Sequence, residues 1–261
     1  MEFTREILLT RYDRGIVEEK EDLVVREYPL TIYLNDEELV TLLCSPAALD
    51  FLALGFLLSE GIINKKEEIK SMKIDEAKGV AYVKTTAPKD MAKYFMGKRM
   101  LTTGCGRGTI FYNVHDSMAC SPIEDNVKIS YTKILSLMKE FSSKSEIFEN
   151  TGGVHSAALS QGDGIIIFHE DVGRHNALDK VLGEGFMQDM NFSDKLLLTS
   201  GRISSEMLTK AGKRGISIVV SRSAPMDLAL KIGLEMNMTI IGFARGQRMN
   251  VYTGKERIID I

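Results

Sequence analysis

The first 43 residues alternate apolar and polar side chains in short runs, which is the period of two that is typical of β-strands. Residues 69–86 repeat this pattern, so both segments are predicted to form strands or hairpins. Between them, Ser45 can cap a helix whose first position is Pro46 and whose stop signal is Gly61. The amino-terminal part is therefore expected to mix strands with a helix.

A glycine-rich segment around Gly104 interrupts this pattern. It follows a short helical pattern over 91–100, and we interpret residues 101–125 as a connecting loop. Cys105 lies in this loop between two glycines, and the nearby Arg107 favours the thiolate form of its side chain. An unhindered thiol on a loop can reach two different sites, as a sulfur carrier requires. Taken alone, the residue fits an incidental free cysteine equally well.

The second half of the chain changes to a regular alternation of strands and helices. A first amphipathic helix is predicted over 129–141. Strands are then predicted over 154–159, 165–169, 195–199, 216–220 and 239–243, and helices from Asn176, Ser204 and Pro225. Such alternation implies an α/β fold with a largely parallel sheet covered by helices.

Length and charge narrow the classes of function. With 261 residues, the chain has room for one medium domain and a smaller one. A formal net charge of −3 leaves no overall basic field, so we expect neither nucleic acid nor a membrane as partner. The longest apolar stretch, 47–58, contains Asp50 and is shorter than the roughly 20 residues that span a bilayer. The first residues lack the apolar segment of a signal peptide, so we expect a cytoplasmic protein.

The cysteines do not form a metal or disulfide pattern. The chain has three cysteines, Cys44, Cys105 and Cys120. Their odd number and wide spacing argue against a disulfide framework and against a zinc site made of cysteines alone. Cys44 lies in an apolar run and is predicted to be buried, whereas Cys120 has weaker flanking chemistry and is a secondary candidate thiol. At least one thiol is left free for chemistry.

Arginine recurs in the loops that follow the predicted strands. In a parallel sheet these loops meet at the carboxyl ends of the strands, where ligands usually bind. The candidates are Arg174, Arg202, Arg222, Arg245 and Arg248. A single loop of this composition is more often an ordinary surface loop, but recurrence after every strand predicts a cleft for a phosphorylated, nucleotide-like ligand.

The same region also invites a metal interpretation, because His169, Glu170, Asp171 and His175 lie close together. Their spacing is not that of a zinc-binding helix, and Gly173 interrupts the face that would carry the ligands. We therefore expect no metal site, and we expect the two carboxylates to orient Arg174 or backbone amides before a helix begins.

Motifs through most of the chain resemble the formate dehydrogenase accessory sulfurtransferase family, FdhD. They are Cys44-Ser45-Pro46, Gly55-Phe56-Leu57, Glu60-Gly61-Ile62, Gly104-Cys105-Gly106, Thr151-Gly152-Gly153-Val154-His155, the segment from Glu170 to Ala177, Ser200-Gly201-Arg202, Ser223-Ala224-Pro225 and Gly242-Phe243-Ala244-Arg245. The resemblance implies a carrier that takes sulfur from a cysteine desulfurase. It would transfer that sulfur to the molybdenum or tungsten bis(molybdopterin guanine dinucleotide) cofactor, its bound substrate, before the cofactor enters formate dehydrogenase.

The resemblance also implies roles for particular residues. The persulfide-bearing cysteine falls on Cys105. Cofactor contacts fall on Phe243, Ala244, Arg245, Gly246, Gln247 and Arg248, to which we add Arg174, His175, Arg202 and Arg222. A GDP-like nucleotide would mimic the cofactor at this site.

The fold implied by the resemblance has three parts. These are a smaller amino-terminal α+β domain (1–100), a sulfur-carrier loop (101–125) and a three-layer, cytidine-deaminase-like α/β domain (126–261). The zinc chemistry of deaminases needs an H-x-E and a P-C-x-x-C motif. The corresponding stretches, 175–177 and 200–205, lack the glutamate and the cysteines, which argues against a deaminase.

Two other functions stay open at this stage. The protein could hold the cofactor as a chaperone without moving sulfur, or it could hydrolyse a nucleotide with Asp171 and His175. Many relatives carry a second cysteine in the sulfur loop, but Gly108 stands at that position here, so transfer would rest on Cys105, with Cys120 a distant assistant. We expect a homodimer, because two-fold dimers are the commonest oligomers.

Overall fold

The computed structural model describes residues 2–87, 100–101, 109–110, 122–125 and 127–259. Residues 91–99 of the helix predicted over 91–100 lie outside these residues, and so do Cys105, Cys120 and most of the predicted loop. Within the described part, β7 (Met100–Leu101) pairs antiparallel with β8 (Thr109–Ile110), on either side of the segment that carries Cys105.

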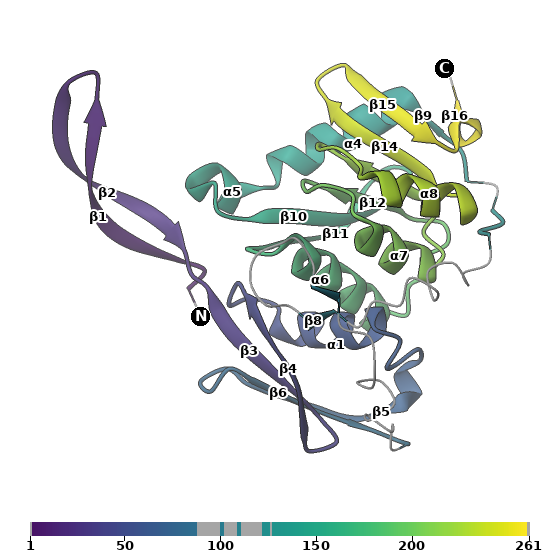
Figure 1. The fold of residues 1–261 in the computed structure, drawn as a ribbon, viewed down its shortest axis with the longest axis horizontal. Helices are drawn as coiled ribbons and strands as arrows, with labels where there is room; N and C mark the ends of the chain where they lie inside the picture. The colour runs from purple at the N-terminus through teal and green to yellow at the C-terminus, as the bar shows by residue number, and fades with distance from the viewer. Residues whose placement is uncertain (1, 88–99, 102–108, 111–121, 126, 260–261) are drawn as a thin grey trace.

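A six-stranded sheet forms the centre of the carboxyl-terminal half (Figure 1). In spatial order its strands are β11 (Gly164–Asp171), β10 (His155–Gln161), β12 (Leu196–Thr199), β13 (Ile218–Ser221), β14 (Thr239–Arg245) and β15 (Arg248–Thr253). Only β12, β13 and β14 pair in parallel. The expectation of a largely parallel sheet was wrong, because hairpins at both edges supply antiparallel pairs.

Helices cover both faces of this sheet. The helix α4 (Tyr131–Ser143) lies on one face, and α6 (Arg174–Met187), α7 (Ser205–Lys213) and α8 (Asp227–Glu235) lie on the other. Alternate strand residues enter the two cores: Leu197 packs toward α6 and α7, while Leu198 packs toward α4. The α/β class is thus confirmed, as a mixed rather than a parallel sheet.

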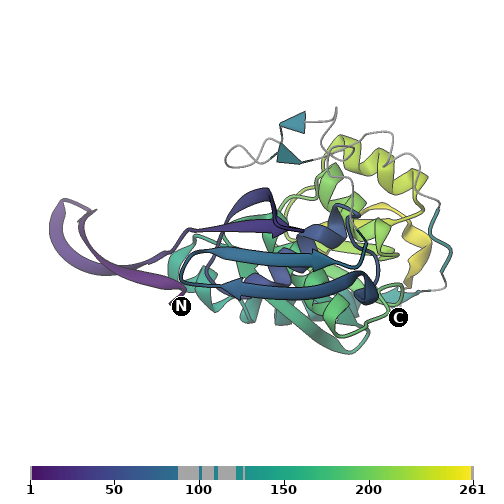
Figure 2. The same ribbon diagram turned by 90° about the horizontal axis from the view of Figure 1, so that it is seen from below.

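The amino-terminal half contains a second sheet and a helix. The sheet order is β4 (Glu37–Cys44), β3 (Tyr28–Leu34), β6 (Val80–Thr85) and β5 (Ile69–Asp75), which confirms both predicted strand regions. The helix α1 (Leu49–Ser59) packs between this sheet and α6, as Figures 1 and 2 show. One continuous apolar core therefore joins β3, β6, α1 and α6.

The start of α1 differs from the prediction. The helix begins at Leu49 rather than Pro46, and its cap position, Ala48, has a left-handed backbone with φ of 51°. Ser45 does not cap it. The Ser45 hydroxyl instead accepts a hydrogen bond from the Val172 N–H at 3.1 Å, so this motif ties the amino-terminal half to the end of β11.

The remaining elements are short or peripheral. Two long strands, β1 (Thr4–Asp13) and β2 (Ile16–Val25), form a separate two-stranded sheet. The others are η1 (Lys66–Glu68), β9 (Ile129–Ser130), α5 (Glu146–Thr151), η2 (Lys255–Arg257) and β16 (Ile258–Ile259). No helix in the described part of the chain has the length and apolar character needed to cross a membrane.

Candidate functional site

The arginine-bearing loops gather at one edge of the six-stranded sheet. Strands β11 and β12 are both antiparallel to β10, and β13 and β14 are parallel to β12, so all four end at the same edge. Backbone and side-chain hydrogen bonds join neighbouring loops: the Ser221 hydroxyl donates to the Gly201 carbonyl at 2.6 Å, and the Phe243 N–H donates to the Ser223 carbonyl at 3.0 Å. The edge is thus a connected platform.

A cavity of about 680 Å³ opens between α4 and this edge. Its walls come from α4 and from the loops after β13 and β14. It is lined by Tyr131, Thr132, Leu135, Ser136, Met138, Lys139, Ser142, Arg222, Arg245, Gly246 and Gln247. A volume in this range holds one drug-sized or nucleotide-sized molecule.

The turn that closes the cavity has a special backbone. Arg245 and Arg248 face each other across the two-residue turn Gly246-Gln247, and Gly246 has a left-handed φ of 60°. Phe243, just before it, also has a positive φ of 53°, which a large side chain adopts at a cost of about 1–3 kcal/mol. The bend at Phe243 lets Ala244 enter the core beneath α4 and leaves Arg245 exposed beside the cavity.

The α4 wall was missed by the sequence analysis. Tyr131, Leu135 and Lys139 are spaced four residues apart, so they share one helix face. Lys139 adds a cation, and Tyr131 adds an aromatic ring that is 40% exposed. The spacing was visible in the sequence, but the strand edge that this face would meet was not.

Arg174 and Arg202 do not line this cavity. They lie near His155: a side-chain carbon built on Gly201 would be 3.1 Å from the Arg174 Cβ and 3.6 Å from the His155 Nδ1. Burial lowers the pKa of His155, and the charges of Arg174 and Arg202 lower it further. These two arginines form a second cationic group at the same edge, next to α6 and α7.

Arg248 is exposed and is likewise absent from the cavity lining. The predicted set of five arginines is therefore divided. Arg222 and Arg245 line the cavity beside α4, and Arg174 and Arg202 surround His155.

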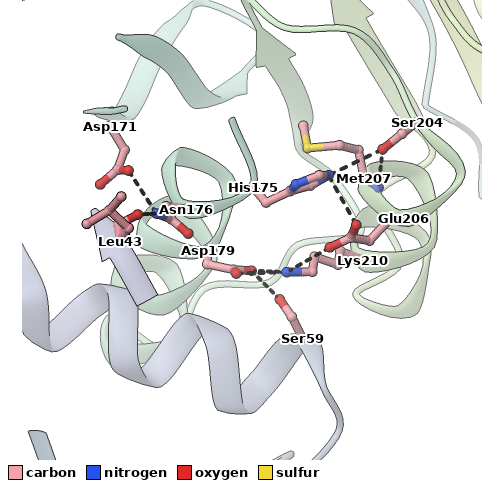
Figure 3. A network of polar contacts seen from close by, with 10 residues as sticks. All are labelled: Leu43, Ser59, Asp171, His175, Asn176, Asp179, Ser204, Glu206, Met207 and Lys210. Atoms are coloured by element: carbon pink, nitrogen blue, oxygen red, sulfur yellow. Dashed lines mark hydrogen bonds and ion pairs between the residues drawn. The ribbon is translucent and has the colours of Figure 1, made fainter. Parts of the chain in front are cut away.

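His175 belongs to a buried polar network between helices (Figure 3). Its Nε2 lies 3.3 Å from the Ser204 hydroxyl and 3.3 Å from the Glu206 Oε2. Burial, followed by the charges of Lys210 and Arg174, lowers the pKa of His175 to about 2. The imidazole is therefore neutral, and it joins the start of α6 to the start of α7 rather than forming an ion pair.

Deeper in this network, Lys210 forms an ion pair with Asp179 at 2.7 Å, and the Ser59 hydroxyl donates to Asp179 at 2.6 Å. Burial alone would lower the pKa of Lys210, but the carboxylates of Asp179 and Glu206 raise it above its usual value. Burial also raises the pKa of nearby Glu60, to about 7. The network fixes α1, α6 and α7 beneath the site.

The carboxylates of the segment 170–176 orient backbone amides, as predicted. Glu170 accepts the N–H groups of Ile147 and Phe148, and Asp171 accepts that of Gly173 at 2.9 Å. Asp171 also pairs with Lys180 at 2.6 Å, with both side chains buried. In the described part of the chain, no group of three His, Cys, Asp or Glu side chains is placed to hold a metal ion.

Cys44 is buried, as predicted. Its side chain is inaccessible, and burial followed by the charge of Asp171 raises the pKa of its thiol to about 12. Such a thiol stays protonated and unreactive at neutral pH. This leaves Cys105 and Cys120, which lie outside the described residues, as the cysteines with chemistry to offer.

Comparison with known proteins identifies relatives that match nearly the whole chain. A family model described as FdhD/NarQ matches residues 25–259. The sulfur carrier protein FdhD of Bacillus licheniformis is 46% identical over 248 residues, which cover 95% of this chain and 94% of that protein. That of Bacillus subtilis is 44% identical and covers 95% of both chains. A crystal structure of a formate dehydrogenase accessory protein from Desulfotalea psychrophila superposes with a TM-score of 0.81 at 27% identity, covering 99% of this chain and all of that one.

Proposed function

The chain belongs to the FdhD/NarQ family, and from this premise we propose that it is a sulfur carrier in the maturation of formate dehydrogenase. The observation that supports this proposal is that the chain is similar over nearly its whole length to proteins named sulfur carrier protein FdhD. In this proposal the protein is a sulfurtransferase that receives sulfur from a cysteine desulfurase. It passes the sulfur to the molybdenum or tungsten bis(molybdopterin guanine dinucleotide) cofactor, which is its substrate.

Cys105 carries the sulfur between the two partners. Its thiolate attacks the outer sulfur of the desulfurase persulfide, a new S–S bond forms on Cys105, and the desulfurase cysteine leaves as a thiolate. In the second step, the outer sulfur moves to the metal and Cys105 returns to a thiolate. The metal centre supplies the two electrons that reduce this sulfur to sulfide. One cysteine is enough for both steps, which matches the absence of a second cysteine at position 108.

The cavity beside α4 holds one of the two guanine dinucleotide groups of the substrate. Guanidinium groups bind phosphate oxygens through two parallel hydrogen bonds, and Arg222 and Arg245 bring two of them to one cavity. Lys139 adds a third cation, and the backbone at Gly246 lets a phosphate approach closely. A GDP-like nucleotide would occupy the same cavity.

The layer order of the carboxyl-terminal half supports a cytidine-deaminase-like scaffold for residues 126–261. Where a deaminase holds zinc, this chain has His175 and the loop from Ser200 to Ser205, without cysteines. We place Arg174, Arg202 and the neutral His175 there as a second anion-binding group. The protein would act in the cytoplasm, as a homodimer, between the desulfurase and formate dehydrogenase.

Mass spectrometry tests the carrier role. After incubation with a cysteine desulfurase and cysteine, the peptide that contains Cys105 should gain the mass of one sulfur atom, and the Cys105→Ala variant should gain none. This variant should still bind GDP, which separates sulfur loading from cofactor binding. Full activation of formate dehydrogenase by Cys105→Ala would instead favour a chaperone that only holds the cofactor.

A further inference from the structure

The strands β1 and β2 form an arm that projects from the rest of the molecule (Figures 1 and 2). Ten residues of each strand pair without interruption, and the turn Arg14-Gly15 has a positive φ at both positions, as tight hairpins require. The arm meets the body near its base, where Val25 lies against Gly153. The family-model match begins at residue 25, where the arm ends.

The arm exposes apolar side chains along its length. The exposed fractions are 67% for Leu8, 78% for Tyr12, 66% for Ile16 and 57% for Val17. A two-stranded hairpin without further packing is marginally stable in water, and a long free edge readily pairs with another strand. The arm therefore has the properties of a surface that another strand completes.

Charge distinguishes the two free edges. β2 carries Glu18, Glu19, Glu21 and Asp22 against one Lys20, so two copies meeting along β2 would repel. β1 carries two basic and two acidic residues: Arg5, Glu6, Arg11 and Asp13. Only the β1 edge is therefore suited to meet a second copy of itself.

The hydrogen-bond pattern shows which residues of β1 face that edge. The Arg26 N–H donates to the Phe3 carbonyl at 3.0 Å, so Phe3 is in a hydrogen-bonded pair with β2. Because these pairs alternate along an antiparallel ladder, odd-numbered residues of β1 bond to β2 and even-numbered residues point their N–H and C=O groups outward. Leu8 and Thr10 are then available to bond a third strand.

Charge favours one register among those that two-fold symmetry allows. A two-fold axis places one residue of β1 opposite itself in the partner. If Leu8 faced itself, Arg5 would face the partner's Arg11, which repels. If Leu9 faces itself, Leu8 lies opposite the partner's Thr10 and both are hydrogen-bonded, while Arg5 lies opposite the partner's Asp13.

We propose that the arm is a dimerisation surface, in which β1 pairs antiparallel with β1 of a second copy of this chain with Leu9 on the two-fold axis. The result is a four-stranded sheet of two arms. Two Arg5–Asp13 pairs flank its centre, and the backbone groups of Glu6, Leu8, Thr10 and Tyr12 gain partners.

The oligomeric state of the full chain tests this directly. Sedimentation velocity should show a dimer at micromolar concentration. Asp13→Arg places two like-charged pairs in the interface and should raise the dimer dissociation constant on the order of tenfold. The combined variant Arg5→Asp/Asp13→Arg should restore it, because the opposite charges then meet again. A monomer throughout the micromolar range, or a dimer that Asp13→Arg leaves unchanged, overturns the proposal.

Cross-linking tests the register independently of affinity. Leu9 faces its own copy in a non-hydrogen-bonded pair, where Cα atoms are about 4.5 Å apart, within reach of a disulfide. Leu9→Cys should therefore form an intermolecular disulfide at position 9 under mild oxidation, identified by peptide mass spectrometry. Ile7→Cys lies on the same face but opposite the partner's Arg11, so it should not. Equal cross-linking at both positions contradicts the register.

Discussion

Gly55 of α1 and Gly183 of α6 face each other where the two helices cross. A side-chain carbon built on Gly183 would lie 2.9 Å from the Gly55 nitrogen and 2.0 Å from the Phe51 carbonyl oxygen. One built on Gly55 would lie 1.7 Å from the Asp179 carbonyl oxygen. The helix backbones are thus in direct contact, and this contact brings Ser59 within hydrogen-bonding distance of Asp179.

Gly55→Ala should destabilise the protein strongly. The added methyl group meets backbone atoms of Asp179 in α6, and neither helix can move away without opening the shared core. We expect a loss of about 3 kcal/mol in the free energy of unfolding, as for overpacked cores. Urea unfolding monitored by circular dichroism measures it.

Gly164→Ala is the matched control for that measurement. A carbon built on Gly164 meets its nearest neighbour, the Glu140 Oε2, only at 3.9 Å. Its effect should stay within about 0.5 kcal/mol. Equal unfolding midpoints for the two variants would contradict the close contact of α1 and α6.

The sequence was most informative where the pattern is local. The central strands could be predicted because each contains a short run of three apolar residues. The helix predicted from Ser204 is confirmed as α7, and the Ser204 hydroxyl caps it by accepting the Met207 N–H. The loops after these strands followed from the same alternation. Strand β15 was missed, because its alternation of exposed and half-buried residues is short and contains two polar positions on the exposed face.

Features that depend on distant contacts could not be predicted. Gly55 weakens a helix by local propensity, and only the backbone of α6 explains its presence. The pairing of Lys210 with Asp179 and the approach of α4 to Arg245 likewise join segments far apart in the chain. The division of the arginines between two faces of one sheet edge follows from how α4, α6 and α7 pack, which no single motif encodes.

The buried ion pair beneath the site gives a second stability prediction. Lys210→Met removes the cation and leaves Asp179 and Glu206 charged in a buried environment, so the protein should lose about 3–5 kcal/mol. Lys78→Met removes a more exposed partner of Asp75 and should cost less than about 1 kcal/mol. Thermal unfolding of both variants compares them, and a similar melting temperature for the two would argue against the buried network.

Glu60 should make stability depend on pH. Its pKa is raised to about 7 in the folded protein, mainly by burial, so the folded state binds more protons than the unfolded state between the usual carboxyl pKa and pH 7. The wild-type protein therefore loses stability through this group as the pH rises across that interval. Glu60→Gln should remove the loss and gain on the order of 1–3 kcal/mol over wild type at pH 8, but little at pH 4.

The exposed Glu149→Gln variant is the control for Glu60. Other titrating groups are common to all three proteins, so differences between their unfolding free energies at each pH isolate the substituted carboxyl. A Glu60→Gln curve that stays parallel to wild type from pH 4 to pH 8 would show that folding does not raise the pKa of Glu60.

Thiol reactivity should separate Cys44 from the remaining cysteines. Because Cys44 is inaccessible and its thiol pKa is about 12, iodoacetamide at pH 8 should leave it unmodified in the folded protein. Peptide mass spectrometry after denaturation in urea should then show it fully alkylated. Rapid modification of Cys44 without urea would mean that the contact between Ser45 and β11 opens readily.

The cavity beside α4 makes different predictions for two neighbouring arginines. Arg245 lines it, so Arg245→Ala should weaken GDP binding by about 1.5–3 kcal/mol, roughly 10- to 150-fold, if one charge-assisted hydrogen bond is lost. Arg248 faces it across the same turn but does not line the cavity, so Arg248→Ala should change the affinity less than about threefold. Lys139→Ala, on the helical wall, should behave like Arg245→Ala. Isothermal titration calorimetry compares the three, and equal losses for Arg245→Ala and Arg248→Ala would place the nucleotide on the open turn instead of in the cavity.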